Sequence, residues 1–287
     1  MTRTLCAFSG GLDSTWLAYR VLTETDDELH LFWMDFSNLF FTDRDGNQKR
    51  YYNELLPAEK IVGPRIVEWL NVNVRKVTFE TIEGVEPDPL ATQAPGATAR
   101  SWRVIPMLRV AADLCAKSGY ERFIYARSPE NVRTPGQEKR WEWFYQFWES
   151  IAPKGVTFET PLIKDWQGRP HAIAGLPPEL LALALPCNNP LIVNGEPQIC
   201  NVCDKCFLTA EARKQLEKKN AKPDKILDDL LKKRQAGQYI GNDKDADAKF
   251  NQKPYRFPPF EVIDVVKPSD NPVPIPSRSP DKPGGKP

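Results

Sequence analysis

Several kinds of residue are scarce in this 287-residue chain, and each scarcity excludes a class of protein. The only histidines are His30 and His171, and neither supports a catalytic triad. The charges nearly cancel, with 39 Lys and Arg against 38 Asp and Glu, which argues against a protein that coats nucleic acid through bulk charge. No apolar run approaches the roughly 18–20 residues that cross a bilayer, and the first residues contain no apolar signal-peptide region. We therefore expect a cytoplasmic protein with no membrane partner.

Proline, by contrast, is abundant. The chain has 27 prolines, well above the usual share of about 5%. Ten of them lie between Pro254 and Pro287, in a stretch whose last part lacks apolar periodicity. Such a composition is typical of extended or disordered chain, so we predict a proline-rich, partly disordered tail over residues 237–287.

Short apolar stretches alternate with helical patterns in the first part of the chain. Strands are predicted over residues 4–8, 29–35, 72–79, 122–126 and 156–159. Helices are predicted from the loop after the first strand to Leu22, over 53–70, over 102–117 and over 138–151. The second is expected to be interrupted at Gly63-Pro64, and the third to hold Pro106 in its first turn. This alternation predicts an α/β domain over residues 1–178, an open parallel sheet with helices on both faces. Short helices around 179–185 and 209–234 predict a smaller helical unit over residues 179–236.

The first predicted strand leads into a glycine loop and a helix, which is the local geometry of a phosphate site. The loop reads Ser9-Gly10-Gly11-Leu12-Asp13-Ser14. Glycines let the backbone approach an anion, and the helix N-terminus adds partial positive charge. The Ser9 and Ser14 hydroxyls can donate to phosphate oxygens, and Asp13 fits best beside Mg²⁺ that bridges phosphates. The spacing and lysine of a Walker loop are missing, and a tight turn of small residues is the alternative reading.

Four of the six cysteines gather within twenty residues, as Cys187, Cys200, Cys203 and Cys206. Four thiolates at this spacing fit tetrahedral Zn²⁺, which would tie together a unit with little core of its own. An iron–sulfur cluster is the rival, although no cysteine follows Cys206 three residues later. A disulfide framework is disfavoured in a cytosolic protein. Cys6 and Cys115 fit best as small core residues.

The string from Phe8 to Ser14 resembles the SGGxDS signature of the ATP pyrophosphatase-loop (PP-loop) enzymes. Those enzymes cleave ATP between the α and β phosphates and pass AMP to a substrate. The combination with a cysteine quartet ending in CxxCxxC resembles one branch, the 7-cyano-7-deazaguanine synthases, over roughly residues 3–215. Phe158-Glu-Thr-Pro-Leu-Ile is similar to a segment of that family, and Trp102-Arg103-Val104 resembles, more weakly, its Gly-Arg-Asn segment.

The resemblance implies a carbon–nitrogen ligase that uses ATP, Mg²⁺ and a structural Zn²⁺. Its substrates would be 7-carboxy-7-deazaguanine and ammonia. It implies a homodimer, for which the aromatic residues on two sides of the predicted helix 138–151 offer an interface. The residues expected at the nucleotide are Phe8, Ser9, Gly10, Gly11, Leu12, Asp13, Ser14 and Asp35, with Asp13, Ser14 and Arg103 in the chemistry and Cys187, Cys200, Cys203 and Cys206 on the metal. Asp35 is included because it ends the second predicted strand, where open α/β sheets bind ligands, although a helix cap fits it as well.

The sequence departs from that family on the acceptor side. Val104 stands where the family has asparagine, Ala126 where it has glycine, and Phe36-Ser37-Asn38 where it has a tyrosine-glycine-glutamine run. The acceptor therefore stays open. It could be a protein amine, as for synthase-like proteins of some antiviral gene clusters, or a tRNA base. The basic residues between Arg213 and Arg234 favour tRNA, but acidic residues interleave with them as on a solvated helix face. A non-enzymatic zinc scaffold is a further alternative.

Overall fold

The computed structural model describes residues 1–36, 40–42, 48–50, 55–85, 101–131, 135–201 and 203–235. All of these belong to one compact unit that covers Met1–Pro254. The predicted tail over 237–287 lies outside the described residues, as do Ser37 and Asn38. Within the described ranges, no helix is long and apolar enough to cross a membrane. The division of the chain at residues 178 and 179 stays a prediction.

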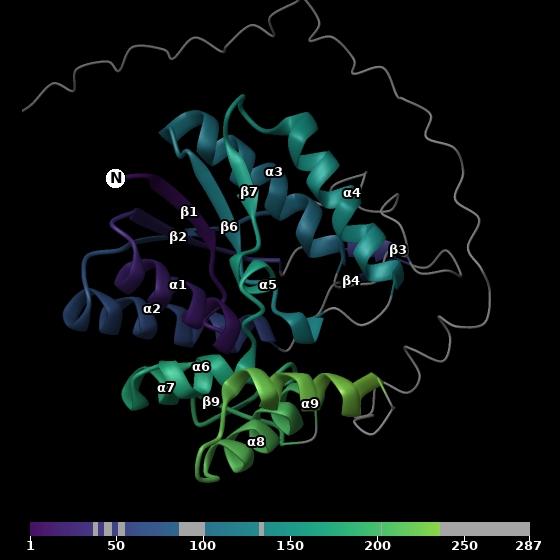
Figure 1. The fold of residues 1–287 in the computed structure, drawn as a ribbon. Coiled ribbons are helices and arrows are strands. Elements are labelled where there is room, and N and C mark those ends of the chain that lie inside the picture. Colours follow the sequence, from purple (N-terminus) through teal and green to yellow (C-terminus); the bar gives the residue numbers. More distant parts are fainter. Residues whose placement is uncertain are drawn as a thin grey trace, which may run out of the picture. The chain divides into compact units, whose positions relative to one another are not determined.

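A five-stranded parallel sheet forms the centre of this unit (Figure 1). Its order is β5-β2-β1-β6-β7, and every neighbouring pair is parallel. The strands are β1 (Arg3–Ala7), β2 (Glu28–Met34), β5 (Thr78–Ile82), β6 (Arg122–Tyr125) and β7 (Thr157–Glu159). The predicted α/β class with a parallel sheet is confirmed.

Helices cover both faces of the sheet, as predicted (Figure 1). The pair α1 (Leu12–Glu24) and α2 (Leu55–Asn73) lies on one face, and α3 (Ser101–Ser118) and α4 (Pro135–Ile151) on the other. Successive strand residues point to opposite faces, so Cys6 belongs to the core under α1 and α2 while its neighbour Leu5 belongs to the core under α3 and α4. β1 thus supplies two separate hydrophobic cores, and so do β2 and β6.

Two prolines lie inside helices, contrary to prediction. The sequence predicts a helix interruption at Pro64 and a first-turn position for Pro106. α2 continues through Gly63-Pro64, so the predicted interruption is wrong. Pro106 is the sixth residue of α3, not part of its first turn. Each proline removes one backbone hydrogen bond, and burial of the flanking apolar residues compensates for that loss. Because α2 extends to Asn73, the third core strand begins at Thr78 and not at the predicted residue 72.

The aromatic residues of α4 pack largely within the chain. Trp143 and Phe147 stack with ring centres 5.3 Å apart, and the guanidinium of Arg109 on α3 lies 5.4 Å from the Phe147 ring centre. Phe147 is 8% exposed. Part of the second apolar side is therefore covered by α3, and the homodimer stays a prediction.

Short helices and one hairpin follow β7 and carry the cysteines (Figure 1). They are α5 (Pro161–Lys164), α6 (Arg169–Gly175), α7 (Pro178–Leu183), β8 (Leu191–Val193), β9 (Glu196–Gln198), α8 (Asp204–Leu216) and α9 (Pro223–Gln235). α6 packs against α1 as well as against α8 and α9, so it joins the cysteine region to the helix that follows the predicted phosphate loop. The hairpins β8–β9 and β3 (Phe40–Thr42)–β4 (Gln48–Arg50) have strands of three residues, too short for a periodic signal.

Candidate functional site

The loop between β1 and α1 needs glycine at its second position. Gly10 has a φ of +68°, in the left-handed region. A Cβ atom at Gly10 would lie 2.6 Å from Cγ2 of Val62 and 3.2 Å from the backbone nitrogen of Gly63. The loop therefore lies directly against α2, and a side chain at position 10 would push the two apart.

The two serine hydroxyls of the loop hold its shape. The Oγ atoms of Ser9 and Ser14 are 3.3 Å apart. The Gly11 amide donates to Oγ of Ser9 at 3.3 Å, and Oγ of Ser14 donates to the Gly11 carbonyl at 3.0 Å. The structure thus brings the predicted serines together at the start of α1.

α1 directs the amides of its first turn toward the same loop. Gly11 is the N-cap, in extended conformation with φ −70° and ψ 158°, and it has no side chain to accept these amides. An uncapped helix N-terminus carries partial positive charge and attracts phosphate. Phe8 and Leu12 are each 2% exposed and anchor the loop in the core. They can therefore reach a ligand only through their backbone.

This loop lies at the topological switch point of the sheet. β1 has β2 on one side and β6 on the other, so the chain leaves β1 in one direction and later returns on the opposite side. Open α/β sheets bind ligands outside the carboxyl ends of their strands at such a point. Ala7 is in register with Phe32 and with Tyr125, so the segments after β2 and β6 reach the same edge. Asp35 lies there, with its amide donating to the Ile82 carbonyl at 2.8 Å.

A buried group of charged side chains adjoins Asp13. Arg169, the first residue of α6, is 2% exposed, and its Nη2 lies 3.7 Å from Oδ2 of Asp13. Its Nη1 donates to Oγ1 of Thr209 on α8 at 2.9 Å, and its backbone amide donates to Oε1 of Glu130 at 2.6 Å. Burial, and then the charge of Asp13, raise the pKa of Glu130. No motif in the sequence marks Arg169, because Glu130 and Thr209 are 39 and 40 residues away from it.

The structure pairs Arg103 with a buried acid. Its Nη2 donates to Oε2 of Glu59 on α2 at 3.1 Å, and its guanidinium lies 4.8 Å from the ring centre of Phe36. Glu59 is 3% exposed and also accepts a hydrogen bond from Nε1 of Trp33 at 3.0 Å. Arg103 therefore lies beside the segment after β2, where the sequence departs from the resembled family.

Arg127 is a second buried cation at this edge that sequence reasoning missed. Its guanidinium lies 4.5 Å from the ring centre of Trp141, and Nη2 donates to Oε1 of Glu138 at 2.7 Å. It is 3% exposed, and desolvation lowers the pKa of its guanidinium. Its Nε has no hydrogen-bond partner within the described part of the chain. The segment after β6 thus places a positive charge over an aromatic ring directly after Ala126, one of the positions at which the sequence departs from the resembled family.

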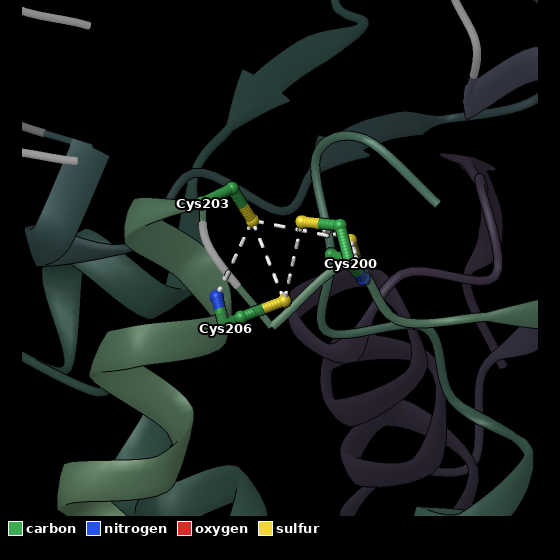
Figure 2. A group of neighbouring side chains, drawn as sticks. Cys200, Cys203 and Cys206 are labelled. Carbon is green, nitrogen blue, oxygen red and sulfur yellow. Dashed lines mark hydrogen bonds between the residues drawn. The ribbon is translucent and has the colours of Figure 1, made fainter. Parts of the chain in front are cut away.

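The four clustered cysteines converge in space as predicted, and Figure 2 shows three of them, Cys200, Cys203 and Cys206. All four Sγ atoms lie within 4.8 Å of one another. Cys203 is the N-cap of α8 and Cys206 lies in the first turn of that helix, while Cys187 and Cys200 come from either end of the segment that contains the β8–β9 hairpin. The cluster can hold a metal ion. Cys6 and Cys115 lie elsewhere in the two sheet cores, and burial raises the pKa of each thiol to about 12.

The thiols of the cluster share protons. The Sγ atoms of Cys187 and Cys203 form a hydrogen bond across 3.9 Å, and this contact lowers the pKa of Cys203 to about 4. Burial, together with its contact to Cys203, raises the pKa of Cys206 to about 11. A bound metal would displace the thiol protons of the cluster, because thiolates are the form of cysteine that binds metal.

Comparison with known proteins gives a distant likeness among solved structures and no match in sequence. No protein-family model and no curated protein matches the sequence. Among solved structures, the fold is similar to that of a U34-tRNA thiolase, NcsA from Methanococcus maripaludis, determined with its 4Fe-4S cluster. The two chains are 11% identical with a TM-score of 0.41, and the match covers 83% of this chain and 69% of the other. A likeness this distant supports no conclusion on substrate, reaction or metal.

Proposed function

We propose that the chain is an ATP-dependent enzyme of the PP-loop type that activates a carboxylate as its adenylate. The observation that carries this proposal is the SGGLDS loop, which resembles the PP-loop signature and has the shape of a phosphate cradle. Gly10 adopts a left-handed φ against α2, and the uncapped first turn of α1 opens at the switch point of a parallel sheet.

The chemistry follows from where the loop would hold the triphosphate. The Ser9 and Ser14 hydroxyls and the amides after Gly11 would bind phosphate oxygens, and the Asp13 carboxylate is an oxygen ligand suited to Mg²⁺. A bound Mg²⁺ would neutralise phosphate charge. With the triphosphate fixed, a carboxylate oxygen of the acceptor attacks the α-phosphorus, and the bond to the bridging oxygen breaks as pyrophosphate leaves.

The most specific form of the proposal is the reaction of the resembled family. Ammonia attacks the acyl carbon of the adenylated 7-carboxy-7-deazaguanine, AMP leaves, and the amide forms. A second ATP then drives loss of water to the nitrile. Arg103 and Arg127, each of which lies over an aromatic ring, would border the acceptor in this reaction.

We also propose that the cysteine cluster holds zinc. Zinc–thiolate bonds of about 2.3 Å at tetrahedral angles place sulfurs about 3.8 Å apart. The hydrogen-bonded Sγ pairs are separated by 3.4 Å to 3.9 Å. A four-iron cluster would require wider spacing, because each cysteine would bind a different iron. The donor set and its spacing thus support one tetrahedral ion with a structural role.

The direct test is pyrophosphate release from ATP, with 7-carboxy-7-deazaguanine and ammonium, by the zinc-loaded protein. We expect release that Asp13→Ala abolishes and that Asp26→Ala, which removes an exposed aspartate, leaves unchanged. If the wild-type protein releases no pyrophosphate, or Asp13→Ala releases as much, this form of the proposal is wrong.

A tRNA acceptor is the second candidate, because the basic residues of α8 and α9 that the sequence singles out are largely exposed. Exposed cations on these helices and their connection are Arg213, Lys214, Lys218, Lys219, Lys222 and Lys225. Exposed acids, among them Glu217 and Asp224, interrupt this surface. If tRNA is the acceptor, its affinity should fall steeply with salt. Absent or salt-insensitive binding would remove this candidate. A protein-amine acceptor would instead add a fixed mass to a co-expressed partner.

A further inference from the structure

Arg169 is a buried cation that has no role in the proposed reaction as described above. Only 2% of the residue is exposed, and its guanidinium lies between Asp13, which is 8% exposed, and Thr209, which is 5% exposed. Removing a charge from water is costly unless geometry and partners are good. Here the partners come from two distant segments, the nucleotide-loop helix α1 and the helix α8 that begins at the cysteine cluster.

Each hydrogen bond of this arrangement has one possible direction. A guanidinium is donor only, so Nη1 of Arg169 donates and Oγ1 of Thr209 accepts, at 2.9 Å. The Thr209 hydroxyl proton is used elsewhere, because Oγ1 donates to the Lys205 carbonyl one turn earlier in α8, at 2.7 Å. The side chain of Thr209 is therefore locked to its helix, and through it so is the guanidinium.

The backbone of Arg169 is fixed as well. Its amide donates to Oε1 of Glu130 at 2.6 Å. A Cβ atom at Gly168 would come within 2.4 Å of both carboxylate oxygens of Glu130, so the preceding residue must be glycine for this approach. Hydrogen bonds thus fix both the backbone amide and the guanidinium of Arg169. The other terminal nitrogen of the guanidinium, Nη2, faces the carboxylate of Asp13.

A separate backbone link connects the same two regions. The Leu185 amide donates to the Gly10 carbonyl at 3.0 Å, and Leu185 forms a parallel bridge with Gly11. Leu185 precedes the cluster ligand Cys187 by two residues. Two contacts therefore connect the loop with the cysteine region. Its backbone accepts the hydrogen bond from Leu185, and the Asp13 side chain faces Arg169, which binds Thr209 of α8.

We infer that Arg169 is a positioning residue for Asp13, held in place by Thr209 of the cysteine-bearing helix. It fixes the direction of the Asp13 carboxylate at the nucleotide loop, so that the carboxylate meets the magnesium–ATP complex without first reordering. This inference rests on the proposed ATP site. It adds that the cysteine unit sets the affinity of that site as well as stabilising its own fold.

The test is the affinity of the zinc-loaded protein for MgATP by titration calorimetry. Thr209→Val removes the acceptor while keeping the charge of Arg169 and nearly the volume of the side chain. Thr4→Val is the matched control, since Thr4 is also a buried threonine whose Oγ1 accepts a hydrogen bond from an arginine, Arg122, but it lies near the amino end of β1, away from the loop. We expect Thr209→Val to weaken MgATP binding about tenfold, the size of one lost hydrogen bond to a charged group, and Thr4→Val to leave it unchanged.

A double-mutant cycle separates positioning from general damage. In an Asp13→Asn background, Thr209→Val and Arg169→Met should weaken MgATP binding far less than they do in the wild type, because the group they position is gone. Arg169→Lys should recover part of the affinity lost in Arg169→Met. Zinc content, measured in every variant, should stay at the wild-type level.

The outcomes distinguish this inference from the function on which it rests. A wild-type protein that does not bind MgATP overturns both. If the wild type binds, Asp13→Asn weakens binding, and Thr209→Val and Arg169→Met do not, the inference is wrong while the ATP site stands. Equal losses in the wild-type and Asp13→Asn backgrounds would likewise show that Arg169 does not act through Asp13.

Discussion

Buried charged side chains gather at the carboxyl edge of the sheet, where the proposed reaction would take place. Asp13, Glu130, Arg127 and Arg169 are 8%, 2%, 3% and 2% exposed. Charges at such depth cost several kcal/mol each unless they are paired, and they are found mostly where function requires them. Two acids and Arg169 form one group, and Arg127 forms another with Glu138. At the scale of single residues, these buried charges support the proposed placement of the ATP site at this edge.

The pKa of Glu130 makes a testable contribution to the pH dependence of stability. Its folded-state pKa is raised above the ordinary value of 4.5 by burial and by Asp13. The stabilisation by the protonated form is fully present below the unfolded pKa and is lost as pH rises through the folded pKa. Glu130→Gln keeps an oxygen for the Arg169 amide but does not ionise, so it should gain in Tm relative to the wild type as pH rises from about 4.5.

The matched control for that measurement is Glu142→Gln, which changes an exposed glutamate of α4. Its difference from the wild type should stay constant across the same pH range. A wild-type minus Glu130→Gln difference that is equally flat would contradict the buried, proton-holding state of Glu130.

At the scale of elements, the Ser9–Ser14 loop can keep its conformation only because Gly10 lies directly against α2 without a side chain. Gly10→Ala would place a methyl group against the stiff side chain of Val62 in a left-handed backbone conformation. We expect a loss of about 2 kcal/mol or more in the free energy of unfolding, and loss of MgATP binding. Chemical denaturation and calorimetry measure the two.

Gly84→Ala separates the two causes of that loss. Gly84 has a φ of +69°, nearly that of Gly10, but a Cβ atom there meets nothing within 4 Å. It should cost only the backbone strain, on the order of 1 kcal/mol. If Gly10→Ala is no more destabilising than Gly84→Ala, the loop does not lie against α2 as described.

The sequence predicts the main elements well where periodicity is strong. Four of the five predicted sheet strands agree with the observed ones within one residue at either end, and the parallel sheet follows from their alternation with helices. The helix α2 is different. Gly63-Pro64 predicts an interruption, but tertiary packing keeps the helix continuous and shifts the next strand to Thr78. Propensity is a local quantity, whereas the burial that overrides it depends on residues far away in the chain.

At the scale of the whole molecule, the proposed metal at the cysteine cluster would compensate for a small core. The core between α8 and α9 consists of four buried residues, Leu208, Ala212, Ile226 and Leu230. The cluster sulfurs also adjoin the larger core that contains Phe8 and Leu12 of the nucleotide loop. A metal bound by the cysteine cluster would therefore stabilise the region around α8 and the core beneath the Ser9–Ser14 loop.

Loss of the metal should unfold that region while the sheet persists. In Cys203→Ala, we expect zinc content well below one ion per chain and rapid tryptic cleavage in the lysine-rich helices α8 and α9. Cys115→Ala is the control, since Cys115 is a buried cysteine outside the cluster, and it should keep both zinc and resistance to trypsin. A Cys203→Ala protein with full zinc and unchanged resistance would contradict the role assigned to the cluster.

The separation of the site residues along the chain determines which parts of the candidate site can be predicted from the sequence. The loop from Ser9 to Ser14 and the cysteine quartet are visible because their spacing along the chain is itself the signal. Arg169, Glu130 and Thr209 are not visible, because folding brings them together from separate segments and none lies in a recognisable motif. Arg103 is found by resemblance alone, and its pairing with the buried Glu59 emerges only from the structure.

The most direct test of the central claim is hydrogen exchange of the amides in residues 9–14, measured with MgATP and with Mg²⁺ alone. If this loop binds the triphosphate, these amides gain hydrogen bonds to phosphate oxygens. Their exchange should then slow on addition of MgATP, while that of the β8–β9 hairpin stays unchanged. MgATP that binds without slowing exchange in residues 9–14, or protection confined to another part of the chain, would contradict the account.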